Sequence, residues 1–598
     1  MAFLAPKRPF VLLDDSRSGH PDAASYLYED PIAVIAAQRL DEVADALAAI
    51  DAWTARGHFV AGWIGYEAGF ALEPRLARRP LALAPEPLIW LGVFTGRQRF
   101  EGARRDEFWT AARPTLHGYA LEVEAPGLDA AGYGARLARI KDYLNAGDVY
   151  QVNFTFPLRL AADGDPLALY AAVRRAQRVA HGAIVATGAW TVLSFSPELF
   201  VARRGDLVTC RPMKGTLARG MTGEEDAARA AALAEDAKSR AENLMIVDLL
   251  RNDLARVAKP GSVAVPRLFE VEPYQTLMQM TSTVTARAGA SPAQLIRALF
   301  PCGSVTGAPK IRAMEIIADL EAVPRGVYTG AIGHVAPSGD LAFSVPIRTL
   351  VLDAVGKGRL GIGSGIVADS GAATEYAECL LKSRFLNANW PAFDVFETLG
   401  WTRRTGWRWR DRHLARLTRS AAYFGFPFDP AAAMALLEDA VTPLQDPLRG
   451  RLLLASGGAL ALHLGPAPTP LEHATIALAE EQVASDNPFL YHKTTHRLPY
   501  EKALEAARVR SGCFEVIFEN ERGEVTEGSF TNVFIKRKGR LLTPAACCGL
   551  LPGILRQVLL EEGRCAEAVL TRADLIDAEA LYIGNALRGL IPARLLTS

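Results

Sequence analysis

One strand-rich stretch decides the fold, and it occupies residues 181–216, HGAIVATGAWTVLSFSPELFVARRGDLVTCRPMKGT. Its apolar residues come in short β-branched and aromatic runs separated by glycine or proline, which is typical of successive strands. The stretch ends near Lys214, which lies between a methionine and a glycine. An ammonium group in such a setting needs an explanation, because burial of an unpaired charge is costly.

Helical patterns surround this stretch along the chain. Apolar residues recur at helical spacing in residues 135–147, 240–257, 309–323 and 374–388, and a second strand-rich run occupies residues 342–353. This alternation predicts an α+β protein with many long strands. The rhythm changes after Leu386, and Pro391 indicates a break, so we predict two domains, 1–388 and 389–598.

Composition narrows the classes of function. The 598 residues include 66 basic and 66 acidic side chains, so no net charge attracts nucleic acid or an anionic membrane. Seven cysteines show neither zinc-ligand spacing nor a disulfide framework. No apolar run reaches the roughly 20 residues that span a bilayer, and the N-terminus does not resemble a signal peptide. We therefore expect a cytoplasmic protein that acts on small molecules, without a nucleic-acid or membrane partner.

Acidic residues accompany Lys214. Glu198 lies at a predicted strand end sixteen positions earlier, so two adjacent antiparallel strands can bring both groups to one cleft; the alternative is a surface ion pair of little consequence. Glu242 lies on one predicted helix, whereas Glu375 and Glu378 lie on another and share a face by their i, i+3 spacing. Glutamates that converge without lysines favour a cation, and oxygen ligands of this kind suit Mg²⁺.

Two segments supply groups that suit an anion. Gly361, Gly363 and Gly365 in GIGSGIVADSG offer backbone N–H groups, and we expect them at a helix entrance. A dinucleotide site is disfavoured, since the third fingerprint glycine and the βαβ unit are missing. Ser304 and Thr306 in CGSVTGAPKIRAMEII precede another helix, where they either contact a ligand or serve as an ordinary N-terminal cap.

Eight segments, in order, resemble the chorismate-utilising enzymes, a family that includes anthranilate synthase component I, isochorismate synthase and aminodeoxychorismate synthase component I. The segments cover most of residues 130–386 and read IKDYLNAGDVYQVNFT, SFSPELF, RPMKGT, RAENLMIVDLLRNDLARV, FPCGSVTGAPKIRAMEII, RGVYTGAIGHV, FSVPIRT and GIGSGIVADSGAATEYAECLLKSR. The resemblance implies two large antiparallel sheets with flanking helices. It also implies that Glu242 and Glu378, with Glu375 beside them, hold Mg²⁺ against the ring carboxylate of chorismate.

The same resemblance assigns the substrate contacts. Tyr328 and Arg348 hold the enolpyruvyl carboxylate, and the guanidinium fork of an arginine suits a carboxylate. The other substrate-binding residues that it implies are Thr306, Gly363, Ser364 and Gly365.

Lys214 indicates one branch of this family. Relatives that add ammonia or water at ring carbon 2 carry alanine in this slot, whereas the aminodeoxychorismate branch carries lysine, as in PMKGT here. A lysine that attacks carbon 2 can displace the carbon-4 hydroxyl through the conjugated ring, after which ammonia enters at carbon 4. Glu198 matches the general acid for the leaving hydroxyl. Gln279 stands where anthranilate synthases carry histidine, which again argues against that branch.

The source of ammonia lies outside this chain. A glutaminase needs an activated cysteine with a histidine partner, and none of the seven cysteines has that sequence context. We therefore predict a separate glutamine amidotransferase subunit.

The remainder of the chain resembles the class IV pyridoxal-phosphate enzymes, which include branched-chain aminotransferases, D-amino-acid aminotransferases and aminodeoxychorismate lyase. The segments that carry the resemblance are DRHLARLTRSAAYFG, YHKTTHRLPYEKAL, GEVTEGSFTNVFI and LLPGILRQ. Each of the first three, taken alone, is more typical of solvated charge. The resemblance implies a two-subdomain α/β fold, pyridoxal 5'-phosphate as cofactor and a homodimer formed through this domain. It assigns Lys493 to the Schiff base, Thr398 to proton transfer, Glu527 to the pyridinium nitrogen, and Arg416, Ile554, Leu555 and Asn585 to the phosphate. Ala586 departs from the hydroxyl residue common beside Asn585.

Together these resemblances predict a bifunctional enzyme that makes 4-aminobenzoate from chorismate and ammonia. The first alternative is an anthranilate or isochorismate synthase joined to a class IV aminotransferase. The second is a catalytically silent scaffold whose C-terminal half only binds pyridoxal phosphate.

Overall fold

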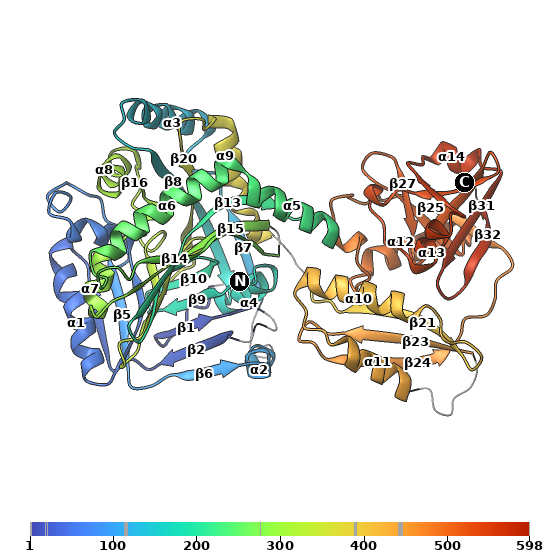
Figure 1. Cartoon of the computed structure of the whole chain (residues 1–598), viewed down its shortest axis with the longest axis horizontal. Coiled ribbons are helices and arrows are strands. Elements are labelled where there is room, and N and C mark those ends of the chain that lie inside the picture. Colours follow the sequence, from blue (N-terminus) through green and yellow to red (C-terminus); the bar gives the residue numbers. More distant parts are fainter. Residues whose placement is uncertain are drawn as a thin grey trace. The chain divides into compact units, whose positions relative to one another are not determined.

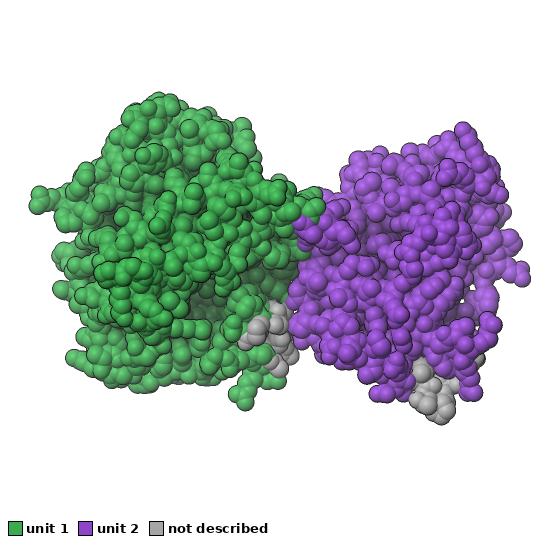
Figure 2. Space-filling model, in the orientation of Figure 1, with its two compact units in different colours: residues 1–219, 228–390 green, residues 220–227, 391–598 purple. Residues whose placement is uncertain are grey.

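The computed structural model describes residues 3–17, 20, 22–112, 118–275, 277–387, 391–440 and 447–596. The chain divides into two compact units, one of Met1–Arg219 and Ala228–Trp390, the other of Gly220–Ala227 and Pro391–Ser598 (Figure 2). The domain boundary expected at 388/389 lies outside the described residues and stays a prediction.

Two ten-stranded antiparallel sheets form the described part of the first unit (Figure 1). In spatial order, the first sheet contains β16 (Gly307–Ala308), β8 (Gln151–Gly164), β20 (Lys357–Ile366), β19 (Thr349–Asp353), β10 (Trp190–Ser196), β9 (His181–Ala186), β1 (Phe10–Asp14), β2 (Ala24–Glu29) and β6 (Gln98–Glu101), with β7 (Tyr119–Val123) beside β8. The second sheet contains β13 (Met213–Ala218), β15 (Leu277–Arg287), β12 (Leu207–Arg211), β11 (Leu199–Arg204), β18 (Leu341–Ser344), β17 (Ala331–Val335), β4 (Phe59–Ile64), β5 (Ile89–Phe94) and β3 (Ala33–Ala37), with β14 (Ala264–Pro273) beside β15.

The two sheets pack face to face, and helices cover their outer faces. Alternation along β1 shows the arrangement, since Val11 belongs to the core between the sheets and Leu12 to the core beneath the helices. The helices on the first sheet are α3 (Ala130–Asn145), α4 (Pro166–Ala176), α8 (Lys310–Leu320) and α9 (Ala372–Leu381). Those on the second sheet are α1 (Val43–Ala55), α6 (Ala237–Ala255) and α7 (Pro292–Leu299). This architecture confirms the α+β class and the two antiparallel sheets with flanking helices.

The strand-rich stretch that opened the sequence crosses from one sheet to the other at a proline. Its strands β9 and β10 belong to the first sheet and β11 and β12 to the second, with Pro197 between them. The run 342–353 crosses back at Pro346, between β18 and β19. Proline lacks the N–H that a sheet ladder needs, so both crossings begin where pairing must stop. The N–H of Phe195 donates to the carbonyl of Arg348 (3.1 Å), which places the two crossings, and therefore Glu198 and Arg348, side by side.

Three of the four predicted helices are confirmed as α3, α6 and α8. The fourth prediction, residues 374–388, is too long: α9 ends at Leu381, a 3-10 turn covers Arg384–Asn387, and residue 388 lies outside the described residues. The Ser383 hydroxyl donates to the carbonyl of Leu380 (2.7 Å), and such local bonds compete with helix continuation.

The second unit contains two subdomains, as expected. An antiparallel sheet of β22 (Gly406–Trp407), β21 (Val395–Thr402), β23 (Leu448–Leu454) and β24 (Leu460–Pro466) lies with α10 (Arg410–Phe424) and α11 (Pro430–Asp439). The other sheet contains β27 (Val525–Gly528), β26 (Glu515–Glu519), β25 (Ala474–Leu478), β32 (Gly589–Leu595), β31 (Ala580–Asn585), β28 (Asn532–Arg537), β29 (Arg540–Pro544) and β30 (Ala566–Ala568). It is mixed, because β25 pairs in parallel with both β26 and β32, and it is accompanied by α12 (Leu498–Ser511) and α13 (Ile554–Glu561). Among the described helices of the whole chain, none is both long and apolar enough to cross a membrane.

Candidate active sites

The first candidate site lies between the two sheets of the first unit, where the apolar filling ends. Strand β20 pairs with β8 from Lys357 to Ile366, but with β19 only from Gly358 to Leu360. Arg359 lies opposite Val351, a residue of the core between the sheets, so the alternate residues Gly361, Gly363 and Gly365 face the same space. Three glycines on one face leave a surface without side chains, which gives a ligand room.

The expectation that these glycines lie at a helix entrance is wrong. They occupy the interior of β20, whereas α9 begins at Ala372 with Gly371 as its N-cap. Close approach explains why glycine is needed there instead. A Cβ on Gly361 would lie 2.2 Å from the ring of Tyr328, and a Cβ on Gly365 would lie 2.0 Å from the amide nitrogen of Gln151.

Lys214 reaches this glycine face from the second sheet. A Cβ on Gly365 would lie 3.1 Å from the Lys214 ammonium nitrogen. Glu198 and Lys214 do not lie on adjacent strands as expected. Strand β12 ends before Pro212, and β13, which carries Lys214, pairs with β15 instead of β11. The carboxyl of Glu198 is instead joined to this segment by the backbone N–H of Met213.

Glu198 is a buried acid, with 3% of its surface exposed. The Ser304 hydroxyl donates to its Oε1 (2.5 Å), and burial raises the pKa of Glu198 to about 7, with Ser304 and Lys214 acting in the opposite direction. The alternative of a surface ion pair is therefore wrong. The capping alternative for Ser304 is wrong as well, since the N-cap of α8 is Pro309, without a side-chain cap. A carboxyl with this pKa still carries a proton near neutral pH, as a general acid must.

The charge of Lys214 is under opposing influences. Burial lowers its pKa, Glu242 raises it, Lys382 lowers it, and Glu198 and Glu378 raise it. Burial is the largest of these effects, and the neutral amine that it favours is the nucleophilic form.

The three expected metal ligands lie on two helices, Glu242 on α6 and Glu375 and Glu378 on α9. Burial raises the pKa of Glu242, and the charge of Glu375 acts in the same direction. The hydroxyl of Ser370 donates to Glu375 (2.7 Å), whereas Glu378 is exposed and pairs with Lys382 (2.8 Å).

The premise that these glutamates converge without lysines is wrong. Lys214 and Lys238 both act on Glu242, and Lys382 also donates to the carbonyl of Gly363 (2.9 Å). Within the described ranges, no group of three or more His, Cys, Asp or Glu side chains is arranged to hold a metal ion. A cation bound beside these described glutamates would need oxygen from a ligand as well.

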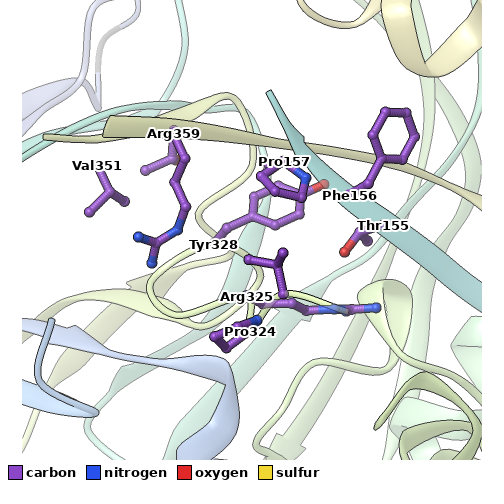
Figure 3. Close-up of a pocket in the computed structure, with 11 residues that line it drawn as sticks. Thr155, Phe156, Pro157, Pro324, Arg325, Tyr328, Val351 and Arg359 are labelled. Carbon is purple, nitrogen blue, oxygen red and sulfur yellow. The ribbon is translucent and has the colours of Figure 1, made fainter. Parts of the chain in front are cut away.

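Tyr328 lies at the Gly361 end of the glycine face, and Arg348 lies at the crossing between the two sheets. The Tyr328 ring covers Gly361, and its phenol oxygen points toward Phe156 and Thr155, away from Arg359 (Figure 3). The guanidinium of Arg348 donates to Gln177 (2.7 Å), and burial lowers the pKa of Arg348. Both side chains can still offer donors to a carboxylate.

The hydroxyl groups of Thr306 and Ser364, two residues expected to contact the substrate, form hydrogen bonds within the protein instead. The Thr306 hydroxyl donates to the carbonyl of Cys302 (3.1 Å). Ser364 points to the opposite face of β20 from its glycine neighbours, where its hydroxyl pairs with that of Tyr133 (3.0 Å). The structure therefore brings Gly365 to Lys214 and places Gly363 on the same face of β20, whereas the Ser364 side chain lies on the other face.

Sequence reasoning missed Gln151 and Lys382. Gln151 is 1% exposed, and neither of its amide atoms has a hydrogen-bond partner in the part of the chain that the structure describes. Its amide nitrogen and the Lys214 ammonium both approach Gly365. A buried amide left unpaired beside a reactive amine suits a polar ligand. The signal that could have found Gln151 is its position in the segment YQVNFT, which carries the family resemblance. Strand periodicity alone predicts only that Gln151 is buried.

The second candidate site surrounds Lys493 in the second unit. The ammonium lies 4.8 Å from the centre of the Phe396 ring, and burial lowers the pKa of Lys493 to about 7. Arg497 and Arg416 lower it further, whereas Glu397 and Glu527 oppose the shift. Thr398 lies two residues after Phe396 on β21 and therefore shares its face.

Arg416 and His413 are buried, so their interpretation as solvated charge is wrong. Both donate to Glu397, Arg416 through Nε (2.7 Å) and Nη2 (2.8 Å), and His413 through Nδ1 (2.6 Å). Arg416 also donates to the carbonyl of Pro552 (3.0 Å), next to the start of α13. This contact brings the guanidinium close to the first helical N–H groups, those of Ile554 and Leu555, an arrangement that suits phosphate.

Burial raises the pKa of Glu527 to about 8, while Arg497 and the backbone N–H of Leu551 act in the opposite direction. The Tyr500 hydroxyl also donates to Glu527 (3.3 Å). Asn585 accepts the N–H groups of the following turn, 585–588, and so shapes the connection between β31 and β32. Glu397, Arg497 and Tyr500 were not found from the sequence, because nothing in their spacing distinguishes them from surface polar residues.

This donor set fits pyridoxal phosphate. It combines an amine with a depressed pKa, a buried carboxyl, and an arginine close to the N–H groups at a helix start. These are the groups that an imine-forming aldehyde, a pyridine nitrogen and a phosphate require.

Comparison with known proteins gives a family match for each of two segments of the chain. Residues 8–388 match the family described as chorismate binding enzyme. The chain belongs to this family of enzymes. Residues 394–596 match the family described as amino-transferase class IV.

Similar proteins are found for the first unit. Aminodeoxychorismate synthase component 1 of Klebsiella aerogenes is 47% identical over 42% of this chain and 56% of its own length. The protein of the same name from Salmonella typhimurium is 43% identical over 54% of this chain and 74% of its own length. The chain thus spans little more than half of the Klebsiella relative. Among solved structures, anthranilate synthase component I of Streptococcus pneumoniae superposes with a TM-score of 0.53 at 25% identity, covering 62% of this chain and 93% of that one.

Proposed function

We propose that the first unit aminates chorismate at carbon 4, and that the second unit converts the product, 4-amino-4-deoxychorismate, into 4-aminobenzoate and pyruvate for folate synthesis. The observation that carries the proposal is the approach of the Lys214 ammonium to the bare glycine face at Gly365. The names of the two synthase relatives support the same branch.

In the first step, the neutral amine of Lys214 attacks ring carbon 2. The double bonds shift, and the carbon-4 hydroxyl leaves as water with the proton of Glu198. Ammonia then attacks carbon 4, the double bonds shift back, and the bond between carbon 2 and Lys214 breaks. The net change exchanges a hydroxyl for an amino group, so that chorismate and ammonia give aminodeoxychorismate and water.

Substrate binding is assigned to the groups around the glycine face. Tyr328 and Arg348 are proposed to bind the enolpyruvyl carboxylate, with Thr306, Gly363, Ser364 and Gly365 near the ring; Ser364 can contribute only its backbone. Mg²⁺, when bound, would neutralise the ring carboxylate, and Glu242 and Glu378 would hold it, with Glu375 behind them.

In the second step, Lys493 removes the proton from the carbon that bears the substrate nitrogen. The neighbouring ether bond breaks, enolpyruvate leaves and becomes pyruvate, and the ring becomes aromatic. Pyridoxal phosphate, when bound, supplies the electron sink for this elimination. Glu527 is proposed to hold its ring nitrogen, Arg416, Ile554, Leu555 and Asn585 its phosphate, and Thr398 to assist proton transfer.

The ammonia is proposed to come from a separate glutamine amidotransferase subunit. The two relatives from Klebsiella and Salmonella are both named as component 1, which supports a second component. We also propose domains of 1–388 and 389–598, a cytoplasmic location, and a homodimer formed through the second unit. The free state of all seven cysteines supports a reducing compartment.

The test is to supply the chain with chorismate, ammonium, Mg²⁺ and pyridoxal phosphate and to identify the products. We expect 4-aminobenzoate and pyruvate in equal amounts. Anthranilate or salicylate would overturn the branch and favour the alternative, an anthranilate or isochorismate synthase joined to an aminotransferase. Accumulation of aminodeoxychorismate would overturn the lyase assignment. If chorismate is not converted into any of these products, the result favours the alternative of a catalytically silent scaffold.

A further inference from the structure

A buried loop carries Tyr328, and its conformation is imposed by charged side chains from other parts of the first unit. The loop covers residues 324–329. Gly326 adopts φ 62° and Thr329 adopts φ 60°, both in the left-handed region. Such a loop keeps a single shape only when its surroundings hold it, because left-handed backbone costs about 1 kcal/mol or more for a residue other than glycine.

Glu67 binds the centre of this loop. Its Oε1 accepts the N–H of Arg325 (2.7 Å), and its Oε2 accepts the N–H of Gly326 (2.9 Å). Two successive N–H groups that converge on one anion form a nest, which is an anion-binding backbone shape. Glu67 is only 2% exposed, and no guanidinium donates to its carboxylate in the described structure, so the loop backbone is its partner.

Other charged groups hold the loop from its flanks. Glu86 accepts the N–H of Val327 (3.2 Å) and the guanidinium of Arg359. The Arg325 side chain pairs with Glu321 through two bonds (2.7 and 2.8 Å) and donates to the carbonyl of Asn153 on β8 (2.6 Å). Figure 3 shows Arg325, Arg359 and Tyr328 around one cavity, with Arg359 and the Tyr328 phenol directed to different sides.

We infer that Glu67 is a positioning residue for the chorismate site, since its carboxylate fixes the loop that presses Tyr328 against Gly361. The inference rests on the proposed function, in which Tyr328 contacts the substrate. Glu67 does not reach the substrate itself, so its removal should weaken substrate binding and leave the chemistry at Lys214 intact. The proposal also explains why a carboxylate is buried there, although burial raises its pKa to about 7.

The test compares four variants by ammonium-dependent turnover. In Glu67→Gln, one of the two loop N–H groups meets an amide NH₂ instead of an acceptor, so we expect the KM for chorismate to rise about ten-fold with kcat within about two-fold. Gly361→Ala displaces the Tyr328 ring directly and should give the same pattern. Tyr328→Phe measures how much the Tyr328 hydroxyl itself contributes to the KM for chorismate. Asp51→Asn is the matched control, because Asp51 on α1 also accepts a backbone N–H (Ala293, 3.1 Å) but holds the start of α7 instead of the Tyr328 loop.

Coupling separates positioning from general support of the fold. If Glu67 acts through Tyr328, then Glu67→Gln should raise the KM for chorismate much less in a Tyr328→Phe background than in the wild-type chain. Additive effects, or an unchanged KM in a folded Glu67→Gln chain, would overturn the inference. If Glu67→Gln does not fold, Glu67→Asp is combined with Tyr328→Phe instead, and additive effects in that pair overturn the inference too.

Failure of the proposed function gives a different result. If the first unit does not use chorismate at all, the wild-type chain shows neither binding nor turnover of chorismate, whatever residue occupies position 67. In that case the inference falls together with the function on which it rests.

Discussion

Two partly buried lysines, Lys214 in the first unit and Lys493 in the second, are both expected to act as neutral amines, but the charges of their neighbours differ in sign. Three of the four charged neighbours that act on Lys214 are carboxylates, namely Glu242, Glu198 and Glu378. The two largest charged influences on Lys493 are arginines, Arg497 and Arg416. Burial lowers the pKa of both lysines, and at Lys493 it reaches about 7.

The difference matches what each amine is proposed to do. Lys493 must be neutral before it captures the cofactor, and Arg497 and Arg416 both favour that form. At Lys214 the neighbouring carboxylates favour the charged form, and burial, the largest effect, opposes them. Burial is therefore the shared cause, and the sign of the neighbours tunes each amine.

The largest expected effect is the reciprocal loss of the two activities. Lys214→Ala should abolish amination, by about 1,000-fold or more, while the absorbance of bound pyridoxal phosphate stays unchanged. Lys493→Ala should remove that absorbance and pyruvate release, while aminodeoxychorismate still forms. Chromatography of the product and a coupled pyruvate assay measure the two steps separately. Full amination by Lys214→Ala would end the nucleophile assignment.

Glu198→Gln should reduce amination by roughly 100-fold to 10,000-fold, because a positioned general acid contributes on that scale. The pKa of Glu198 is about 7, and the protonated form is the acid, so wild-type kcat should fall as pH rises through about 7. Ser304→Ala removes a hydrogen bond that favours the carboxylate form of Glu198. The fall in kcat should therefore move to higher pH in this variant. If the fall in kcat occurs at the same pH in Glu198→Gln, Ser304→Ala and the wild type, it reports another titrating group.

A smaller effect concerns the pKa of Lys493. Capture of pyridoxal phosphate by the cofactor-free chain should accelerate as pH rises through about 7, because the amine reacts when neutral. Arg497→Gln removes a neighbouring positive charge and should move the midpoint upward by about half a unit or more. Arg508→Gln is the control, since this arginine donates to the carbonyl of Phe514 and does not act on Lys493. Equal midpoints in all three chains would contradict the comparison.

The smallest expected effect is on stability. Burial raises the pKa of Glu527 from 4.5 to about 8, so the folded second unit binds a proton that the unfolded chain releases. Its contribution is fully present below about pH 4.5 and is lost as pH rises through about 8. Glu527→Gln should therefore flatten the decline of the midpoint of thermal unfolding between about pH 4.5 and about pH 8 in the cofactor-free chain. A decline as steep in the variant as in the wild type would assign it to other groups.

Local patterns in the sequence predicted much of the fold. The helices α3, α6 and α8 follow from apolar spacing, and the strands β9 to β12 follow from short apolar runs bounded by glycine and proline. Pairing between distant strands did not follow. The sequence does not show that β13 pairs with β15, nor that Pro197 and Pro346 mark crossings between two sheets, because those choices depend on contacts far apart in the chain.

The sites divide in the same way. Motif resemblance pointed to Lys214, Glu198 and Lys493, and the first two lie in one buried site. It did not find Gln151, which has no periodic or compositional mark. It also misplaced Gly361, Gly363 and Gly365 at a helix, since a glycine-rich run suits a helix entrance and a strand that another chain segment approaches equally well.

By itself, the sequence determined the chemical groups that are available: a lysine in each unit, the acids near it, and the periodicities that make helices and strands. The tertiary structure decided which of these groups are buried, which meet, and in which direction each pKa moves. The physical reason is that helix and strand propensities act over a few residues, whereas desolvation and Coulomb interactions depend on neighbours that only folding brings together.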